Sequence, residues 1–456
     1  MSFLRESLLS FGSRILLVLA NLPVSMLIAR RLGPEGQGIY ASATTYATTA
    51  AILGLLGIDA AHTYFLSSGR YRGAVVLGNS LLVLGALSVV LIPAFAPILE
   101  VATRGEGEKL HPYLTLAAVL IPIVGARYLM LSVFMARRRI SQFNMVYVAG
   151  NLLLALLLAA GFLGWDAGPR WSLWAFLISQ VVMLGLGIAW IRRDRLVRSF
   201  KPVFSGTLLK ASLSYGVRGF LATILTTFVY RLDTILVVRW LGVAAQGHYF
   251  IAVFLAEKLT HISASVQAVL FPHVSGLSTA DADRLTPRVL RHTLLWVLLA
   301  AIGLYLIAGP LVRIVYGSAF DDSVAPMRIL LPGIAALAVA KLLSADLSGR
   351  NRRFYPTLIM AGALGINVAL NLAWTRTHGI VGAAWASTLA YAGQALLMLL
   401  YFWRVSGVPP GKVLCPDKED WQAYGAILGR LRRRRQVDRL AGRSMRDNSR
   451  NQDADP

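Results

Sequence analysis

Residues 30–40 read RRLGPEGQGIY, and residues 239–249 read RWLGVAAQGHY. Aligned without a gap, the two stretches share Arg30 with Arg239, Leu32 with Leu241, Gly33 with Gly242, Gln37 with Gln246, Gly38 with Gly247 and Tyr40 with Tyr249. A segment that recurs nearly half a chain apart indicates an internal structural repeat. In each copy we expect the first glycine to end one helix and the Gln-Gly pair to lead into the next.

The composition of the chain is that of a membrane protein. The 456 residues are 56% hydrophobic and 15% charged, and the mean hydropathy is +0.61. A soluble chain of this length needs more charge to cover its surface. Apolar stretches of about 20 residues, the length that crosses a bilayer as a helix, recur from residue 8 to residue 403. The sequence therefore predicts an all-α polytopic membrane protein.

We expect twelve membrane-spanning helices, separated by short basic or Gly/Pro-containing gaps. They lie near residues 8–29, 40–66, 73–99, 112–136, 141–163, 171–191, 208–238, 249–272, 290–312, 326–347, 354–374 and 380–403. The repeated segment falls after the first and after the seventh of these helices.

The basic residues indicate the orientation of the chain. Counted gap by gap, 17 Lys and Arg lie on the side of the N-terminus and 8 on the other side, so both termini are expected in the cytoplasm. The longest basic gap, RRDRLVRSFK at 192–201, divides the spans into two groups of six. Because six is even, the groups must be parallel repeats around a central cavity. We expect an N-terminal lobe at 1–200, a C-terminal lobe at 201–403 and a basic, disordered cytoplasmic tail at 404–456.

Several functional classes are disfavoured. The formal net charge of +23 raises nucleic acid as a partner, but most of the arginines lie in short clusters between spans, where topology explains them. The chain has no phosphate-binding Walker loop, no H-E-x-x-H pattern and no Cys/His ligand cluster. Asp321 and Asp322 are interpreted as acids of a turn beside a helix. We expect no metal, no cofactor, no nucleic acid and no enzyme activity.

Four basic residues lie deep within expected spans. They are Arg14, Arg127, Arg218 and Lys341. Ionisable groups inside a membrane are costly and usually face a water-filled interior. We therefore expect them to line the cavity. The alternative is a local ion pair for Arg127, Arg218 and Lys341, and snorkelling to the cytoplasmic surface for Arg14. Guanidinium groups bind phosphate oxygens through paired donors, so this cavity should attract a phosphate or diphosphate and repel cations.

Other ionisable residues have weaker indications. Asp59 and His62 are three positions apart and are expected to form a pair, while Glu257 and His261 are four apart on one helical face. Asp59, Glu257 and His261 are the candidates for coupling to H+ or Na+. We expect Arg231 and Asp233 at the membrane interface, near the outer end of their helix, and Tyr40 and Tyr249 as interfacial aromatic anchors.

Three segments carry a family resemblance. They are IARRLGPEGQGIY at 28–40, YGSAFDDSVAPMRILLPGI at 316–334, and residues 347–388, in which Asn367 and Asn371 precede Gly379-Ile380 and Gly382-Ala383-Ala384. In order and spacing they resemble the polysaccharide transporter branch of the multidrug/oligosaccharidyl-lipid/polysaccharide exporter superfamily. The resemblance covers about residues 8–403.

The resemblance implies a Wzx-type flippase of the bacterial inner membrane. Such a protein moves an undecaprenyl-diphosphate-linked oligosaccharide from the cytoplasmic to the periplasmic leaflet by alternating access, for surface polysaccharide biosynthesis. Its partners would be the polyprenyl-diphosphate-linked glycan and membrane lipids. Family members use a cationic lumen, and Arg14, Arg127 and Arg218 are similar in type.

Two alternatives remain open. A drug or cation antiporter of the same fold would favour acids in the first-lobe cavity, where Asp59 is the strong candidate. A polytopic glycan polymerase or ligase would need a long periplasmic loop, and none is expected. Lipid II flippases of the superfamily carry two further C-terminal helices, which residues 404–456 are too polar to form.

Overall fold

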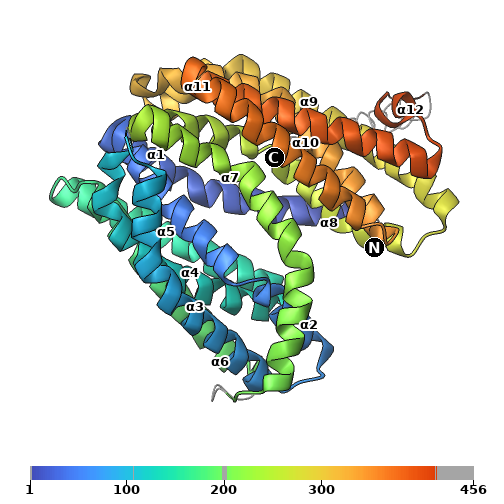
Figure 1. Cartoon of the computed structure of the whole chain (residues 1–456), viewed down its shortest axis with the longest axis horizontal. Helices are drawn as coiled ribbons and strands as arrows, with labels where there is room; N and C mark the ends of the chain where they lie inside the picture. The colour runs from blue at the N-terminus through green and yellow to red at the C-terminus, as the bar shows by residue number, and fades with distance from the viewer. Residues whose placement is uncertain (1–2, 106, 198–202, 416, 418–456) are drawn as a thin grey trace, which may run out of the picture.

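The computed structural model describes residues 3–105, 107–197, 203–415 and 417, with backbone alone for residues 3–19 and 218. Throughout these ranges the regular secondary structure is helical (Figure 1). The helices are α1 (Phe3–Gly54), α2 (Ile58–Ser68), α3 (Gly73–Ala102), α4 (His111–Ala136), α5 (Ile140–Gly164), α6 (Pro169–Arg193), α7 (Gly206–Glu257), α8 (Thr260–Ser275), α9 (Thr279–Tyr316), α10 (Val324–Gly349), α11 (Phe354–Ser406) and α12 (Pro410–Leu414). Two short 3-10 helices, η1 (Glu108–Leu110) and η2 (Ser318–Ser323), precede α4 and α10.

The three longest helices each break at one glycine. Gly33 in α1, Gly242 in α7 and Gly379 in α11 have φ of 64°, 84° and 63°. A residue with a Cβ atom is strained at such angles, so glycine permits the break. Each break separates two of the expected spans, and a bend of 54° joins the end of α1 to α2. Within the described residues, eight helices pass a length and hydropathy test for crossing a membrane, some of them containing such a break. The prediction of an all-α multi-pass membrane protein is confirmed.

The helices form two groups, and the first helix of each half, α1 or α7, begins beside the other group. In Figure 1, α3–α6 lie together at the lower left with α2 at the bottom, and α8–α11 lie together across the upper part. The chain begins beside the second group, where α1 contacts α8 and α9, whereas α7 begins beside α2 and α3 of the first group. A Cβ atom on Gly57 would lie 2.6 Å from the carbonyl oxygen of Gly216, so the start of α7 is in backbone contact with the α1–α2 bend. The two groups therefore share a long interface.

The two copies of the repeated segment meet in space. A Cβ atom on Gly38 would lie 1.7 Å from the carbonyl oxygen of Val243, and one on Gly247 would lie 1.9 Å from that of Pro34. Backbones this close require glycine at both positions. The expectation that Tyr40 and Tyr249 anchor at the membrane interface is wrong. Their exposed fractions are 8% and 1%, because the crossing buries both rings.

The arginines of the repeat cap helices of the opposite group. Arg30 donates to the carbonyl oxygens of Val315, at 2.9 Å, and of Ile314, at the C-terminal end of α9. Arg239 donates to the carbonyl oxygens of Ala102, at 3.0 Å, and Val101, at 3.3 Å, at the end of α3. A cation at a helix C-terminus satisfies free carbonyls and the negative end of the dipole. These reciprocal arginine caps join the groups at what we call the loop end of the molecule.

The beginning of the expected tail is folded. Residues 410–414 form α12, and Val413 is 1% exposed. Arg291 of α9 donates to the carbonyl oxygen of Lys412 at 2.6 Å and pairs with Asp417 at 3.1 Å. The expectation of disorder from residue 404 onward is therefore wrong for 404–415. The remainder of the predicted tail, 418–456, lies outside the described residues.

Candidate functional site

A cavity of about 480 Å³ lies between the two groups of helices. We call it the central cavity. It extends from the crossing of the repeated segments to the end of α7, and α1 and α7 supply most of its wall. Its polar lining residues are Asn21, Ser25, Gln37, Tyr40, Thr44, Thr45, Thr48, Thr49, Tyr128, Thr226, Thr227, Tyr230, Arg231, Glu257 and Lys258. The volume is within the range of small-molecule sites.

One wall of the central cavity is a ladder of threonines. Thr44, Thr45, Thr48 and Thr49 follow the crossing in α1, and their spacing places them on adjoining helical faces. The Thr44 hydroxyl donates to the carbonyl oxygen of Tyr40 at 2.7 Å, so its oxygen is left to accept a further hydrogen bond. Such a wall accepts hydrogen bonds from hydroxyl groups of a bound solute.

Gln37 adds an unsatisfied amide to this wall. Its side chain is 0% exposed, and neither Oε1 nor Nε2 has a hydrogen-bond partner among the described residues. Buried polar atoms are almost always paired with protein, water or ligand. Because Gln37 also lines the central cavity, water or a bound solute is the available partner.

The opposite wall carries charge. Arg231 and Glu257 of α7 form an ion pair with 3.5 Å between Nη2 and Oε2, and both side chains are partly accessible. Lys258 follows directly and places Nζ 3.6 Å from the centre of the Phe254 ring. Two cations and one carboxylate leave this wall with a net positive charge. The expectation that Arg231 lies at the membrane interface is wrong, because α7 turns this side chain into the cavity.

Asp233 anchors a buried network behind the charged wall. It is 4% exposed and accepts hydrogen bonds from the Tyr249 hydroxyl at 2.6 Å, the Thr234 amide at 2.8 Å and the Ser387 hydroxyl at 3.4 Å. The expected interfacial position of Asp233 is therefore wrong. Asn367 continues the network, since its Nδ2 lies 3.4 Å from Ser387 Oγ. This carboxylate ties the repeat tyrosine to the second half of α11.

Of the four cationic candidates, the structure describes the side chains of Arg127 and Lys341, and neither lines the central cavity. Arg127 is 8% exposed, with its guanidinium 4.6 Å from the ring centre of the cavity residue Tyr128. Lys341 has its ammonium 5.5 Å from the ring centre of the cavity residue Tyr230. Both thus lie against cavity tyrosines without being lining residues. The side chains of Arg14 and Arg218 lie outside the described part of the structure.

His62 does not pair with Asp59. It is 1% exposed and its Nδ1 is 2.7 Å from Ser132 Oγ, so its hydrogen-bond partner is on α4. Glu257 and His261 lie on either side of the junction between α7, which ends at Glu257, and α8, which begins at Thr260. At this junction the backbone forms bonds from residue i+3 to i, such as His261 to Lys258 at 3.2 Å. Glu257 pairs with Arg231.

Two other acids have structural partners. Asp346, close to Lys341 in sequence, pairs with Arg350 at 2.7 Å and accepts from the Thr286 hydroxyl at 2.6 Å. Asp321 pairs with Arg313 at 2.8 Å beside η2, which agrees with its interpretation as a turn residue. The described residues hold no group of three or more His, Cys, Asp or Glu side chains that could bind a metal ion.

The neutral wall of the site was not predicted from the sequence. Two signals were present. The pairs Thr44/Thr48 and Thr45/Thr49 have helical i,i+4 spacing in an otherwise apolar span, and Gln37 is shared by both copies of the repeat. Arg231 was expected near the outer end of its helix, because the position of a residue along a helix does not indicate which way its side chain points.

Comparison with known proteins identifies the family of this chain. The sequence model for the family described as polysaccharide biosynthesis protein matches residues 27–325, well over half of the chain. The chain belongs to the polysaccharide biosynthesis protein family. Among curated proteins it is similar to the probable low-salt glycan biosynthesis flippase Agl15 of Haloferax volcanii, with 23% identity over 385 residues, 82% of this chain and 78% of the relative.

Solved structures show the same fold in membrane transporters. A multidrug resistance transporter of the MATE family and the MOP superfamily, in an inward-facing conformation, matches with TM-score 0.71 and 14% identity over 88% of this chain and 98% of its own. The lipid II flippase MurJ in an inward closed conformation matches with TM-score 0.70 and 16% identity over 90% of this chain and 89% of its own. These neighbours show that this multi-pass membrane protein has their two-lobed fold.

Proposed function

We propose that this protein is a flippase that moves an undecaprenyl-diphosphate-linked oligosaccharide from the cytoplasmic to the periplasmic leaflet of a bacterial inner membrane. The observation that carries the proposal is the two-faced central cavity. Hydroxyl groups and the unsatisfied Gln37 amide suit sugar hydroxyls, and Arg231 with Lys258 suits a diphosphate. Membership of the polysaccharide biosynthesis protein family and the similarity to a glycan flippase support the same substrate class.

The transport step that we propose is alternating access. The excess of basic residues on the side of the termini assigns that side to the cytoplasm and the loop end to the periplasm. The crossing of Gly38 and Gly247 and the reciprocal arginine caps then close the periplasmic end, and release requires both to separate. The cavity carries the polar head across while it replaces lost hydration with fixed charges and hydroxyl groups.

In this proposal the charged wall of the central cavity binds the substrate first. Arg231 and Lys258 would hold the diphosphate, and the predicted cations Arg14, Arg127, Arg218 and Lys341 would add a wider positive field. Glu257 is the candidate for ion coupling that lines the cavity, and it shares Arg231 with the substrate. Protonation or Na+ binding at Glu257 would free Arg231 for phosphate, whereas Asp59 and His261 stay predictions without a described link to this wall.

A reconstituted transport assay tests the function. Purified protein in liposomes should make a labelled undecaprenyl-diphosphate oligosaccharide accessible on the opposite leaflet, far faster than protein-free liposomes. A parallel arm should offer a cationic dye under a proton or sodium gradient. Dye export without movement of the labelled glycan would overturn the flippase proposal in favour of a cation antiporter.

A further inference from the structure

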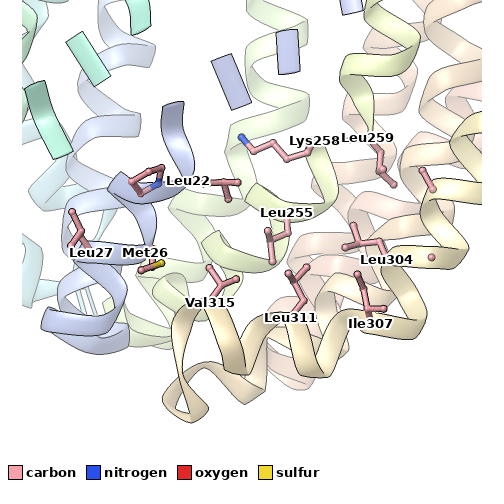
Figure 2. A pocket seen from close by; sticks show the side chains of 13 residues that line it. Leu22, Met26, Leu27, Leu255, Lys258, Leu259, Leu304, Ile307, Leu311 and Val315 are labelled. Carbon is pink, nitrogen blue, oxygen red and sulfur yellow. The ribbon is translucent and has the colours of Figure 1, made fainter. Parts of the chain in front are cut away.

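An apolar groove of about 890 Å³ adjoins the central cavity (Figure 2). It is lined by residues 22–27 of α1, by residues 255–259 at the α7–α8 junction, and by the side of α9 that carries Gly303, Ile307 and Leu311. Lys258 is the single charged side chain among the 13 residues that line it. We call this feature the α1–α9 groove.

Lys258 belongs to both features. It lines the α1–α9 groove and the central cavity, and in Figure 2 its side chain crosses the upper edge of the groove. An ammonium group at the junction of a polar cavity and an apolar groove can bind an amphiphile that carries its negative charge at the start of its hydrocarbon chain. A diphosphate ester of a long alcohol has this arrangement, since its sugars and its hydrocarbon chain leave the phosphates in opposite directions.

The groove is open to the bilayer along its length. Ile307 is 52% exposed and Met26 is 36% exposed, although both are apolar. Residues 300–315 of α9 extend over about 22 Å of helix along the groove and end at the cap formed by Arg30 on Ile314 and Val315. A chain within the groove would thus pass from the cavity into lipid without crossing polar protein.

We propose that the α1–α9 groove holds the first isoprenoid units of the polyprenyl carrier, with the diphosphate at Lys258 and the sugars in the central cavity. This inference rests on the proposed flippase function and assigns the path of the lipid tail. Lipid is as apolar as the groove, so tail contacts add little affinity. The groove acts by positioning, because it lets the phosphates reach Lys258 while the tail stays in a hydrocarbon environment.

A matched pair of glycine substitutions tests the groove. Gly303 lines it, and a Cβ atom there would meet no other atom within 4 Å, so Gly303→Leu adds an apolar side chain at the groove without a clash at its Cβ atom. Gly309, also on α9, has the same free space but is not a lining residue, and Gly309→Leu is the control. In the liposome assay we expect Gly303→Leu to lower the flipping rate about tenfold and Gly309→Leu to leave it unchanged.

Photo-crosslinking supplies a second measurement that does not depend on transport. Undecaprenyl diphosphate with a diazirine in its first isoprenoid units should label the groove segments of α1 and α9. Gly303→Leu should remove this labelling, and unlabelled undecaprenyl diphosphate should compete at least tenfold better than phosphatidylglycerol. Lys258→Gln should abolish the advantage of the diphosphate over neutral polyprenol, and Lys258→Arg should retain it.

The outcomes separate this inference from the proposed function. If the wild type flips the glycan and both glycine variants flip it at equal rates, the groove assignment is overturned and the flippase proposal remains. Labelling outside α1 and α9 has the same consequence. Equal competition by phosphatidylglycerol also overturns it, because the groove would then be a general lipid site. Absence of flipping in the wild type counts against the function, and the crosslinking result still decides what the groove binds.

Discussion

The two walls of the central cavity differ, although each follows one copy of the repeated segment. The α1 wall presents the threonine ladder and Gln37, with no charged side chain among its described lining residues. The α7 wall presents Arg231, Glu257 and Lys258. Both walls follow a glycine break and a Gln-Gly crossing with closely similar backbone geometry. The repeat therefore preserves the scaffold while the side chains beyond it have diverged.

This difference indicates that the scaffold and the walls have separate roles. A scaffold of crossed backbones tolerates almost no change, because its contacts involve main-chain atoms. The walls are made of side chains, so one wall can bind neutral hydroxyl groups and the other can bind anions. Four experiments test this comparison, beginning with the scaffold.

The crossing should be the most sensitive position. Gly38→Ala places a methyl group where the carbonyl oxygen of Val243 would be 1.7 Å away, so the loops must separate. We expect a loss of about 3 kcal/mol or more in unfolding free energy, the cost of severe overpacking. Thermal unfolding in detergent measures it, with Gly85→Ala, whose new Cβ meets no atom within 4 Å, as the control. Equal melting temperatures would contradict the crossing.

The charged wall should come next. Arg231→Gln removes a charged donor worth about 1.5–3 kcal/mol when bound to an anion, which predicts a flipping rate roughly tenfold to a hundredfold lower at subsaturating substrate. Arg231→Lys should recover part of the rate. Arg328→Gln, on a partly exposed α10 side chain stacked on Tyr305, should resemble wild type. If Arg231→Gln and Arg328→Gln behave alike, the anion does not bind this wall.

The reciprocal arginine caps should affect access from the loop end. A cation at a helix C-terminus contributes about 0.3–1 kcal/mol, so Arg30→Gln or Arg239→Gln alone should raise opening about twofold to fivefold. The double variant should show a larger increase. Thr44→Cys in a Cys415→Ser background reports opening through its labelling rate by a membrane-impermeant maleimide from the loop-end side. Unchanged labelling in the double variant would show that the caps do not hold this end closed.

The neutral wall should show a smaller effect than the charged wall. Thr48→Val keeps the shape of the side chain and removes one hydroxyl from a ladder of four. A single neutral hydrogen bond contributes about 0.5–1.5 kcal/mol, so we expect a decrease of roughly threefold to tenfold in the apparent affinity for the glycan. Undecaprenyl diphosphate without sugar should bind equally well to both forms, and Thr48→Ser should restore glycan binding. Loss of binding for the sugar-free lipid as well would refute the division between walls.

Most of the fold could be predicted from the sequence, and less of the site. Hydropathy located the spans, and the repeat located Gly33 and Gly242 as breaks, because both signals are local. Hydropathy did not predict which side chains face the cavity. A helix between lipid and protein is apolar on most faces, so periodicity hardly distinguishes them. Arg231 and Asp233, two residues apart, were expected together at the interface, yet one enters the cavity and the other the buried network around Tyr249.

The sequence by itself determined an all-helical membrane chain with two related halves, since bilayer length, charge asymmetry and glycine geometry act residue by residue. The tertiary structure alone decided that the two loops cross in backbone contact, that Arg30 caps α9 and Arg239 caps α3, and that Lys258 joins the central cavity to the α1–α9 groove. These relations depend on how distant helices pack in three dimensions. No local preference of the chain encodes that packing, because it emerges from the combined burial of both halves.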